Sequence, residues 1–216
     1  MSGPVYSQEL TEKSDEELWR AFVAGTSAAA GSPGAAGNSA AADSGATGKG
    51  VAVRPSDAAL DVLIGRYRRP LFWYLLLSTG KQDSAAQYTR NTWALLAAYR
   101  RPFQGFESFK GWLYAVATQN WVPATHPATF GFAELLDDLK RTEETSRRAK
   151  FFFLITELAP AERQPFLLVT VAGLTVPEAA KACRFDEERA WECLARAYGR
   201  LARAELFKRA EAADEL

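Results

Sequence analysis

The sequence is poor in the side chains that most enzymes and metal sites use. Its 216 residues include one histidine, His126, and two cysteines, Cys183 and Cys193. The cysteines are ten residues apart, a separation that fits no zinc-binding spacing, and no nucleophile motif or apolar pair of carboxylates is present. We therefore expect a protein that is not an enzyme, binds no metal and needs no cofactor. Both thiols are expected to be reduced and packed as small apolar groups.

Signals for export or membrane insertion are also missing. The first residues, MSGPVYSQELTEKSDEE, lack the basic start and the apolar stretch of a signal peptide. The longest apolar run, Leu71 to Leu77, is far too short to span a bilayer. Hydrophobic residues still make up 48% of the chain, enough to form real cores. We expect a cytoplasmic protein with no membrane insertion.

The net charge provides no overall attraction to nucleic acid, because 26 basic residues balance 26 acidic ones. The balance differs along the chain. Residues 57–123 carry eight basic and four acidic side chains, a net charge of +4. Residues 151–216 carry nine basic and eleven acidic ones, a net charge of −2. The earlier segment is therefore the better candidate for contact with a polyanion.

The beginning of the chain combines one short helix with a segment of low complexity. Residues 1–25 contain a helix that Ser14 and Glu17 open with a capping box and that Gly25 closes. Residues 26–56 are almost all Ala, Gly and Ser and show no apolar periodicity. Such a composition cannot bury enough surface to offset the entropy of ordering, so we expect a disordered insert there.

Two later segments are dense in apolar side chains at helical spacing, and neither alternates as strands do. Residues 57–123 are expected to form a bundle of three helices, the first kinked or divided at Pro70 and the second over 83–99. Residues 151–210 are expected to form a second helical domain, and the charged, proline-containing segment 124–150 a linker. The sequence thus predicts an all-α protein of two small domains.

The strongest local signal is a pair of helices over 173–201. Thr175 is a good N-cap, Glu178 follows it at capping-box spacing, and Pro177 suits the first turn. After a short break, Asp186 can cap a longer second helix. Its predicted apolar positions are Ala190, Leu194, Ala197 and Leu201. Two helices joined by a tight turn form either a DNA-binding helix-turn-helix or an ordinary helical hairpin, and the pattern alone favours neither.

Both halves resemble an extracytoplasmic-function type sigma factor, the smallest kind of bacterial sigma factor. In the first half the resemblance lies in SDEELWRAFVAG, in ALDVLIGRYRRPLFWYLLLSTG and in a stretch whose most specific piece is Gly111-Trp112-Leu113-Tyr114 with Asn120. In the second half it lies in ELAPAERQPFLLVTVAGLTVPEAAKACRFDEERAWECLARAYGRL. The halves stand in the order of the family's region two and region four.

The resemblance implies partners for each half. Region two of the family binds core RNA polymerase and captures the minus-ten promoter element, and region four reads the minus-thirty-five element with its helix-turn-helix. An anti-sigma factor is a further possible partner. The residues expected to contact promoter DNA are Asn120, Glu188, Arg189, Trp191, Glu192 and Arg196. The residues expected to contact polymerase are Gln87, Arg90 and Asn91.

Several of these residues have a second interpretation. Arg189 and Arg196 could reach guanine edges or phosphates, and Glu192 a cytosine amino group. Alternatively, these charges form a solvated face with internal pairs such as Glu192–Arg196. Three loop phenylalanines could stack on unpaired bases, or could pack under the third helix of the bundle. These are Phe103, Phe106 and Phe109. Trp112 fits a core position better than a base contact.

The chain departs from the family in its charged contacts. The family's polymerase-binding helix is acidic and carries a Gln-Glu pair, whereas residues 84–93 contain no acid and have Arg90 in place of that Gln. After Asn120, the family's Arg-rich helix is replaced by WVPATHPATFGF, which removes phosphate contacts. We therefore expect a sigma factor that directs polymerase to promoters, or else a degenerate sigma-like module that binds an anti-sigma factor or polymerase without reading DNA.

Overall fold

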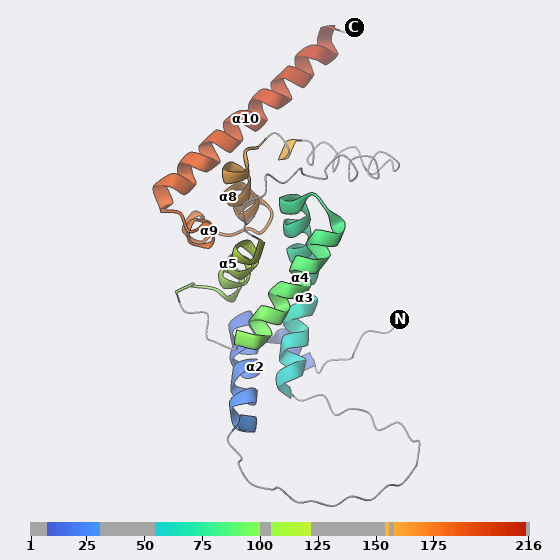
Figure 1. Ribbon diagram of the computed structural model, residues 1–216, viewed down its shortest axis with the longest axis vertical. Coiled ribbons are helices and arrows are strands. Elements are labelled where there is room, and N and C mark those ends of the chain that lie inside the picture. Colours follow the sequence, from blue (N-terminus) through green and yellow to red (C-terminus); the bar gives the residue numbers. More distant parts are fainter. Residues whose placement is uncertain (1–7, 31–54, 100–104, 122–153, 156–157, 215–216) are drawn as a thin grey trace, which may run out of the picture. The chain divides into compact units, whose positions relative to one another are not determined.

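The computed structural model describes residues 8–30, 55–99, 105–121, 154–155 and 158–214 (Figure 1). Within these ranges the regular elements are α-helices, and none is a strand. The all-α prediction is therefore confirmed for the described part of the chain. The predicted linker, 124–150, lies outside the described residues, as do Phe103 and most of the predicted insert.

The described residues fall into two compact units, and the division between them lies inside one helix. Helix α3, Pro55–Thr79, contributes its residues up to Arg66 to the first unit and those from Tyr67 onward to the second. Pro70 follows closely, and its missing N–H is the donor that would reach the Arg66 carbonyl. The helix is nevertheless continuous through Pro70, so the proline does not divide it.

The first unit consists of α1, Gln8–Glu12, α2, Asp15–Ala30, and the beginning of α3. The predicted capping box opens α2. Ser14 Oγ accepts from the Glu17 amide at 3.2 Å, and Glu17 Oε2 accepts from the Ser14 amide at 2.9 Å. α2 ends at Ala30 rather than at Gly25, so the expected end is wrong. The helix runs on through Thr26 and Ser27 into three alanines, and alanine is the residue that favours helix most.

Arg66 holds the first unit together from its position on α3. Its Nη1 forms an ion pair with Asp15 Oδ1 at 2.5 Å. Its Nη2 donates to the backbone carbonyls of Thr11 and Lys13 at 2.7 and 2.8 Å. One guanidinium therefore satisfies acceptors around the junction of α1 and α2. The buried apolar residues of this unit are Leu18, Trp19, Phe22, Ala59, Val62 and Leu63.

In the second unit, α4, Gln82–Tyr99, packs on α5, Phe109–Trp121. Tyr74 of α3 also reaches α5. Its hydroxyl shares a hydrogen bond of 2.7 Å with Thr118 Oγ1, and its ring meets the Tyr114 ring edge-on at 5.3 Å between centroids. Burial raises the pKa of both tyrosines, so these phenols stay neutral and serve as packing groups.

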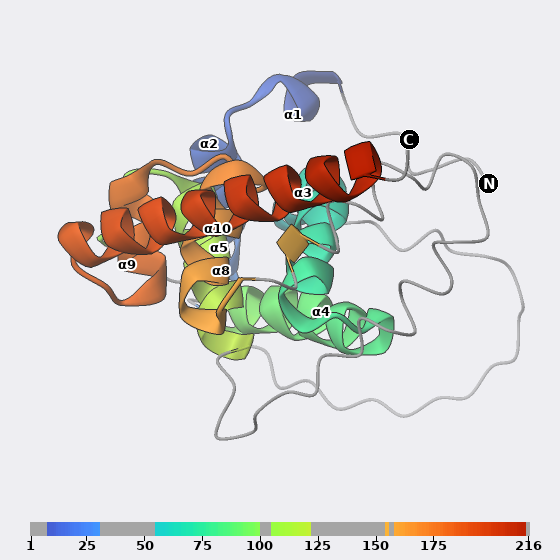
Figure 2. The ribbon, with the colours of Figure 1, turned by 90° about the horizontal axis from the view of Figure 1, so that it is seen from above.

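The second unit also contains α8, Pro160–Thr170, α9, Val176–Cys183, and α10, Glu187–Asp214 (Figure 2). Each of these three helices packs on the other two. Pro165 lies inside α8, which continues through it. Pro165 is only five residues past the start of α8, and a proline near a helix start removes a single bond.

A buried arginine fixes the approach to α8. Arg163 Nε donates to the Ile155 carbonyl at 3.1 Å, and its Nη2 donates to the Leu158 carbonyl at 2.9 Å. Because the guanidinium is buried, its pKa is lowered to about 10, still far above neutral pH. The Arg163 guanidinium therefore stays charged, and its hydrogen bonds order the backbone that precedes the helix.

Candidate nucleic-acid interface

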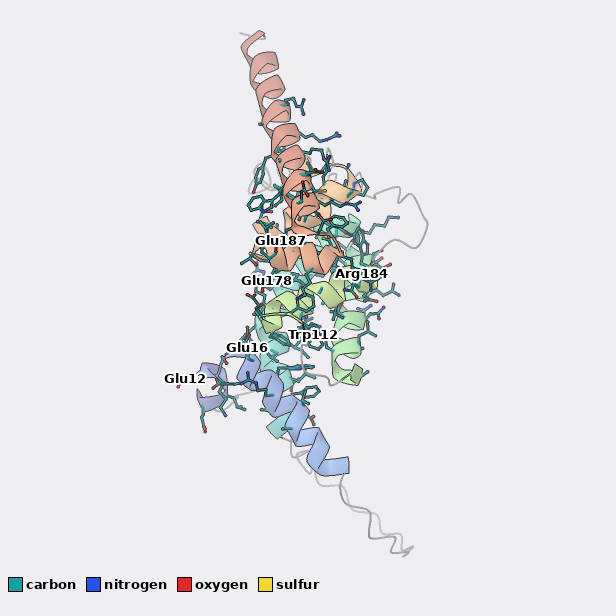
Figure 3. The ribbon with its side chains drawn as sticks, turned by 90° about the vertical axis from the view of Figure 1, so that its left-hand side faces the viewer. Glu12, Glu16, Trp112, Glu178, Arg184 and Glu187 are labelled. Atoms are coloured by element: carbon teal, nitrogen blue, oxygen red, sulfur yellow. The ribbon has the colours of Figure 1, made fainter. Side chains whose placement is uncertain are left out.

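Helix α9 begins as the sequence predicts. The Glu178 amide donates to Thr175 Oγ1 at 3.4 Å, and Glu178 Oε2 accepts from the Thr175 amide at 3.1 Å, which completes the capping box. Pro177 occupies the first turn, where no amide donor is needed. Figure 3 labels Glu178 at this end of α9. The start of the helix pair is therefore defined by local contacts.

A three-residue turn joins α9 to α10. Arg184 adopts the left-handed conformation, with φ 57° and ψ 39°, and the Phe185 amide donates to the Ala180 carbonyl at 2.9 Å. A non-glycine residue in this conformation costs about 1 kcal/mol. Asp186 then caps α10, because its Oδ1 accepts from the Arg189 amide at 2.7 Å. The predicted pair of helices joined by a tight turn is thus present.

Helix α10 has a buried face and an exposed face along its described side chains. The buried residues are Ala190, Cys193, Leu194 and Ala197, and Leu201 is half-buried. The residues of α10 that were expected to contact DNA are all exposed: Glu188, Arg189, Trp191, Glu192 and Arg196. These residues therefore lie on the solvent face of this helix.

The two arginines predicted to contact DNA have different surroundings. The Arg189 guanidinium lies over the Phe185 ring, 4.4 Å from its centroid, and remains exposed. Arg196 instead lies 3.7 Å from Glu192 and 3.6 Å from Glu162 of α8. The internal pair Glu192–Arg196, which the sequence offered as the alternative, is therefore formed. Arg189 keeps its charge available, whereas that of Arg196 is largely compensated.

Glu162 of α8 pairs with a second arginine of α10 as well. Its side chain is only 7% exposed, and Arg200 Nε lies 3.0 Å from its Oε2. Two arginines of α10 thus share one buried carboxylate of α8. The sequence reasoning missed Glu162, because a glutamate in a helix is usually a solvated residue. We call Glu162, Arg196 and Arg200 the α8–α10 ion cluster.

Two large aromatic residues are exposed on α10. Trp191 is 59% exposed and Tyr198 is 52% exposed. They are seven residues apart, about two helical turns, so they lie on the same side of α10 with Ala195 between them. The Tyr198 ring meets Phe166 of α8 edge-on at 5.4 Å, which orients the tyrosine. Tyr198 was not predicted as a site residue, although its spacing from Trp191 is visible in the sequence.

The residues expected to contact polymerase form a separate face on α4. Gln87, Arg90 and Asn91 are all exposed and are spaced by three and four residues, which places them on one side of the helix. Asn120 lies on α5 and is half-buried, and its Nδ2 has no hydrogen-bond partner within the described residues. The predicted site residues therefore lie on three different helices.

The aromatic residues near the start of α5 divide between core and surface. Phe109 is buried between the rings of Tyr67 and Trp112, at centroid distances of 5.9 and 6.1 Å. Phe106 is half-buried, and Lys181 Nζ of α9 lies 5.2 Å from its ring centroid. Packing under the helix is thus correct for Phe109. Trp112 is half-buried, in agreement with a packing role rather than full exposure.

A polar contact between α5 and α9 was not predicted. Ser108 Oγ donates to Glu178 Oε1 at 2.6 Å, and Lys110 Nζ donates to the Gly173 carbonyl at 3.1 Å. Burial raises the pKa of Glu178, but the hydrogen bonds from Ser108 and Thr175 and the charge of Lys110 outweigh it, so the net pKa is lowered. Glu178 therefore remains a carboxylate at neutral pH.

The contact extends to the other end of α9. Arg184 Nη2 donates to Gln119 Oε1 of α5 at 2.9 Å. Beside the Glu178 end lies a pocket of about 550 Å³, lined by the 106–107 loop, α9 and the start of α10. We call the contacts of Ser108, Lys110 and Gln119 with Glu178, Gly173 and Arg184 the α5–α9 latch.

The two cysteines form no disulfide. Both are free thiols; Cys193 is buried and Cys183 half-buried, as the sequence predicts. Burial raises the pKa of Cys183 to about 12, which makes it a poor nucleophile at neutral pH. Among the described residues, no group of three or more His, Cys, Asp or Glu side chains is arranged to hold a metal ion.

Comparisons with known proteins identify no family for this chain. No protein-family model matches the chain, and no curated protein matches its sequence. Of the helices that the structure describes, none combines the length and the apolar character needed to cross a membrane. Any functional assignment therefore rests on the residues and their arrangement.

Proposed function

We propose that this chain is a sigma-like transcription factor that binds core RNA polymerase and contacts promoter DNA through α10. The observation that carries the proposal is the α9–turn–α10 unit. Thr175 and Asp186 cap its two helices, a three-residue turn joins them, and the second helix keeps its outward side chains exposed. In a helix-turn-helix of this kind, the N-terminal residues of the second helix contact base edges in the major groove.

Arg189 is the residue best suited to read DNA. It lies in the first turn of α10, and its position over Phe185 limits the conformations that must be frozen on binding. A guanidinium can donate two parallel hydrogen bonds to a guanine edge. Arg196 is a weaker candidate, because a ligand would compete with Glu162 and Glu192 for its charge.

The proposal is tested by binding the full chain to bacterial core polymerase and by run-off transcription from promoters of its host. Binding together with new, specific transcripts supports the proposal. If neither polymerase binding nor transcripts are found while circular dichroism shows an intact helical fold, the proposal is wrong.

A matched pair of variants then isolates the role of α10. Arg189→Ala is expected to weaken binding to promoter DNA about tenfold, the typical effect of losing one bidentate base contact. Arg69→Ala removes the same charge from an exposed position on α3 and is expected to leave promoter selection unchanged. Both variants should bind core polymerase as the parent chain does. An equal loss in both would reveal only a general effect of charge.

A second candidate function is protein binding without DNA recognition, with an anti-sigma factor or polymerase as the partner. Two observations favour it: Trp191 and Tyr198 expose apolar rings on the same side of α10, and Arg196 is engaged within the protein. Exposed aromatic side chains of this kind are common at the centres of protein interfaces.

Tyr198→Ser separates the two candidates. Tyr198 lies about three turns from the start of α10, beyond the residues proposed to reach bases. Under the first candidate the variant retains promoter binding. Under the second, the chain binds core polymerase without promoter selectivity, and Tyr198→Ser weakens that binding at least tenfold, as expected for an interface aromatic.

A further inference from the structure

One carboxylate joins the starts of two helices that are far apart in the sequence. Glu178 Oε2 accepts from the amide and the hydroxyl of Thr175, both at 3.1 Å, and so completes the cap of α9. Glu178 Oε1 accepts from Ser108 Oγ at 2.6 Å. Ser108 in turn caps α5, because its Oγ accepts from the Gly111 amide at 2.9 Å. The N-terminal caps of α5 and α9 therefore form one hydrogen-bonded chain.

The two helices approach closely because α5 has a glycine where they meet. A Cβ atom at Gly111 would lie 2.8 Å from Glu178 Oε1 and 3.2 Å from Ser108 Oγ. Both distances are shorter than carbon and oxygen tolerate without movement. Glu178 could swing away from an added methyl group, but it would then leave Ser108. Any side chain at residue 111 is therefore in conflict with the latch.

The latch is built of separable polar contacts at its edges. Of its contacts, Lys110 with Gly173 and Arg184 with Gln119 are exposed to solvent, and Ser108 with Glu178 is partly buried. Water can replace the partners of such groups when they part, so each contact has a small net effect on stability. These contacts can break without unfolding either helix, and the packing of α5 on α9 is then the interaction that opposes opening.

The latch also covers an aromatic face. In the described part of the loop before α5, Phe106 is the phenylalanine with an accessible ring, because Phe109 is buried. Lys181 of α9 places its ammonium group over the Phe106 ring. Stacking of an unpaired base requires a free ring face, and the cation must leave before a base can occupy the same face.

We propose that the α5–α9 latch is an autoinhibitory contact that keeps single-stranded DNA away from Phe106. In the closed form, Ser108 and Glu178 hold α9 on α5, and Lys181 covers the ring. In the open form, α9 leaves α5, the ring is uncovered, and Lys181 becomes available for a phosphate. The inference rests on the proposed function, because that function supplies single-stranded DNA as the ligand.

The closed form can be measured without any DNA. Spin labels at Ala94→Cys on α4 and Ala202→Cys on α10, both exposed positions, report the separation of the two helices. The native thiols are first removed by replacing Cys183 and Cys193 with alanine. The parent chain is expected to show one narrow distance distribution. Ser108→Ala and Gly111→Ala are each expected to add a second, broad population.

The glycine variant has a matched control. Gly111→Ala favours the helical state of α5, so a loosened latch in this variant cannot be ascribed to a weakened helix. Gly65→Ala makes the same exchange within α3, where a Cβ atom meets nothing within 4 Å, and should leave the distance distribution narrow. The double variant Ser108→Ala with Gly111→Ala should open the latch no further than one substitution does, because both break the same bond.

Binding of a labelled single-stranded oligonucleotide supplies the second readout. If the closed form dominates, opening variants are expected to bind about fivefold more tightly, because the competent fraction of molecules rises. An unchanged distance distribution in both opening variants overturns the latch, even if the chain proves active in transcription. Opening without tighter oligonucleotide binding overturns autoinhibition. Failure of the proposed function appears differently: no variant, open or closed, would bind polymerase or support transcripts.

Discussion

Two glutamates in the second unit each join a pair of helices, and they do so in different ways. Glu162 joins α8 to α10 and is 7% exposed, with the guanidinium groups of Arg196 and Arg200 as its partners. Glu178 joins α9 to α5 and is less buried, with hydroxyl and amide donors as its partners. The first contact lies between charges, and the second between a charge and dipoles.

This difference indicates which of the two glutamate contacts persists as long as the domain is folded. A buried carboxylate that loses its cationic partners becomes an uncompensated charge, so α8 and α10 must stay together while the domain is folded. A partly exposed carboxylate with dipolar partners can exchange them for water at little cost. Under the proposed function, the α8–α10 ion cluster preserves the helix-turn-helix and the α5–α9 latch allows it to move.

The largest effect is expected from Glu162→Gln. The amide cannot balance Arg196 and Arg200, and the free energy of unfolding is expected to fall by about 2 kcal/mol, below the cost of a fully buried pair because both arginines are half-exposed. Urea denaturation followed by circular dichroism measures the loss. The released arginines should also strengthen non-specific DNA binding and steepen its dependence on salt.

Glu192→Gln is the matched control for that variant. Glu192 pairs with the same Arg196 at 3.7 Å, but its side chain is 59% exposed. Removing its charge should change the urea midpoint far less than Glu162→Gln does, because an exposed pair along a helix is weak. Equal effects would mean that the burial of Glu162 has no importance, and the contrast between permanent and reversible contacts would disappear.

Ser108→Ala is expected to have the next largest effect. It removes the cap of α5 and the tie to Glu178 together, so the free energy of unfolding should fall by about 1.5 kcal/mol. Ser14→Ala removes the cap of α2 alone and should cost about 1 kcal/mol. Urea unfolding of both variants measures the difference, which belongs to the α5–α9 latch. If Ser14→Ala is the more damaging, the tie to Glu178 contributes nothing.

The same tie has a predictable dependence on pH. Burial raises the pKa of Glu178, but hydrogen bonds from Ser108 and Thr175 outweigh it, and the net pKa lies below the ordinary 4.5. A carboxyl group with a lowered pKa stabilises the folded state fully above its ordinary value, and this stabilisation is lost as the pH falls through the lowered one. The distance distribution between α4 and α10 should therefore broaden in the parent chain as the pH falls below 4.5 and through the lowered pKa of Glu178. In Glu178→Gln it should not change with pH over that range.

Local signals were enough to predict most of the unit formed by α9, the turn and α10. Thr175, Glu178 and Asp186 act on amides within three residues of themselves, so their roles are visible from spacing alone. The buried face of α10 was predicted for the same reason, because helical spacing fixes which side chains share a side. Leu201, at the end of that series, is half-buried rather than buried.

Contacts between distant segments could not be predicted in this way. Ser108 and Glu178 are 70 residues apart, and no periodicity relates them. On α4, Thr89 and Trp93 are buried, whereas Tyr88 and Leu95 are only half-buried. The packing partners of the helix decide which of its sides is covered. A polar threonine satisfies itself there by donating to the Ala85 carbonyl at 2.7 Å.

The smallest effect is expected at Arg184, where backbone conformation and the latch act in opposite directions. Glycine adopts the left-handed conformation without the cost of a side chain, about 1 kcal/mol, so Arg184→Gly should relieve that cost. It also removes the exposed hydrogen bond to Gln119, and the net gain in the free energy of unfolding is expected to be only about 0.5 kcal/mol. Arg184→Ala loses the same bond and keeps the strained conformation, so it should destabilise the protein. Urea unfolding compares the two variants, and the spin-label distance shows whether both loosen the latch equally. If glycine and alanine prove equally destabilising, the left-handed conformation carries no cost here, and the side-chain bond to Gln119 is the stronger tie between α9 and α5.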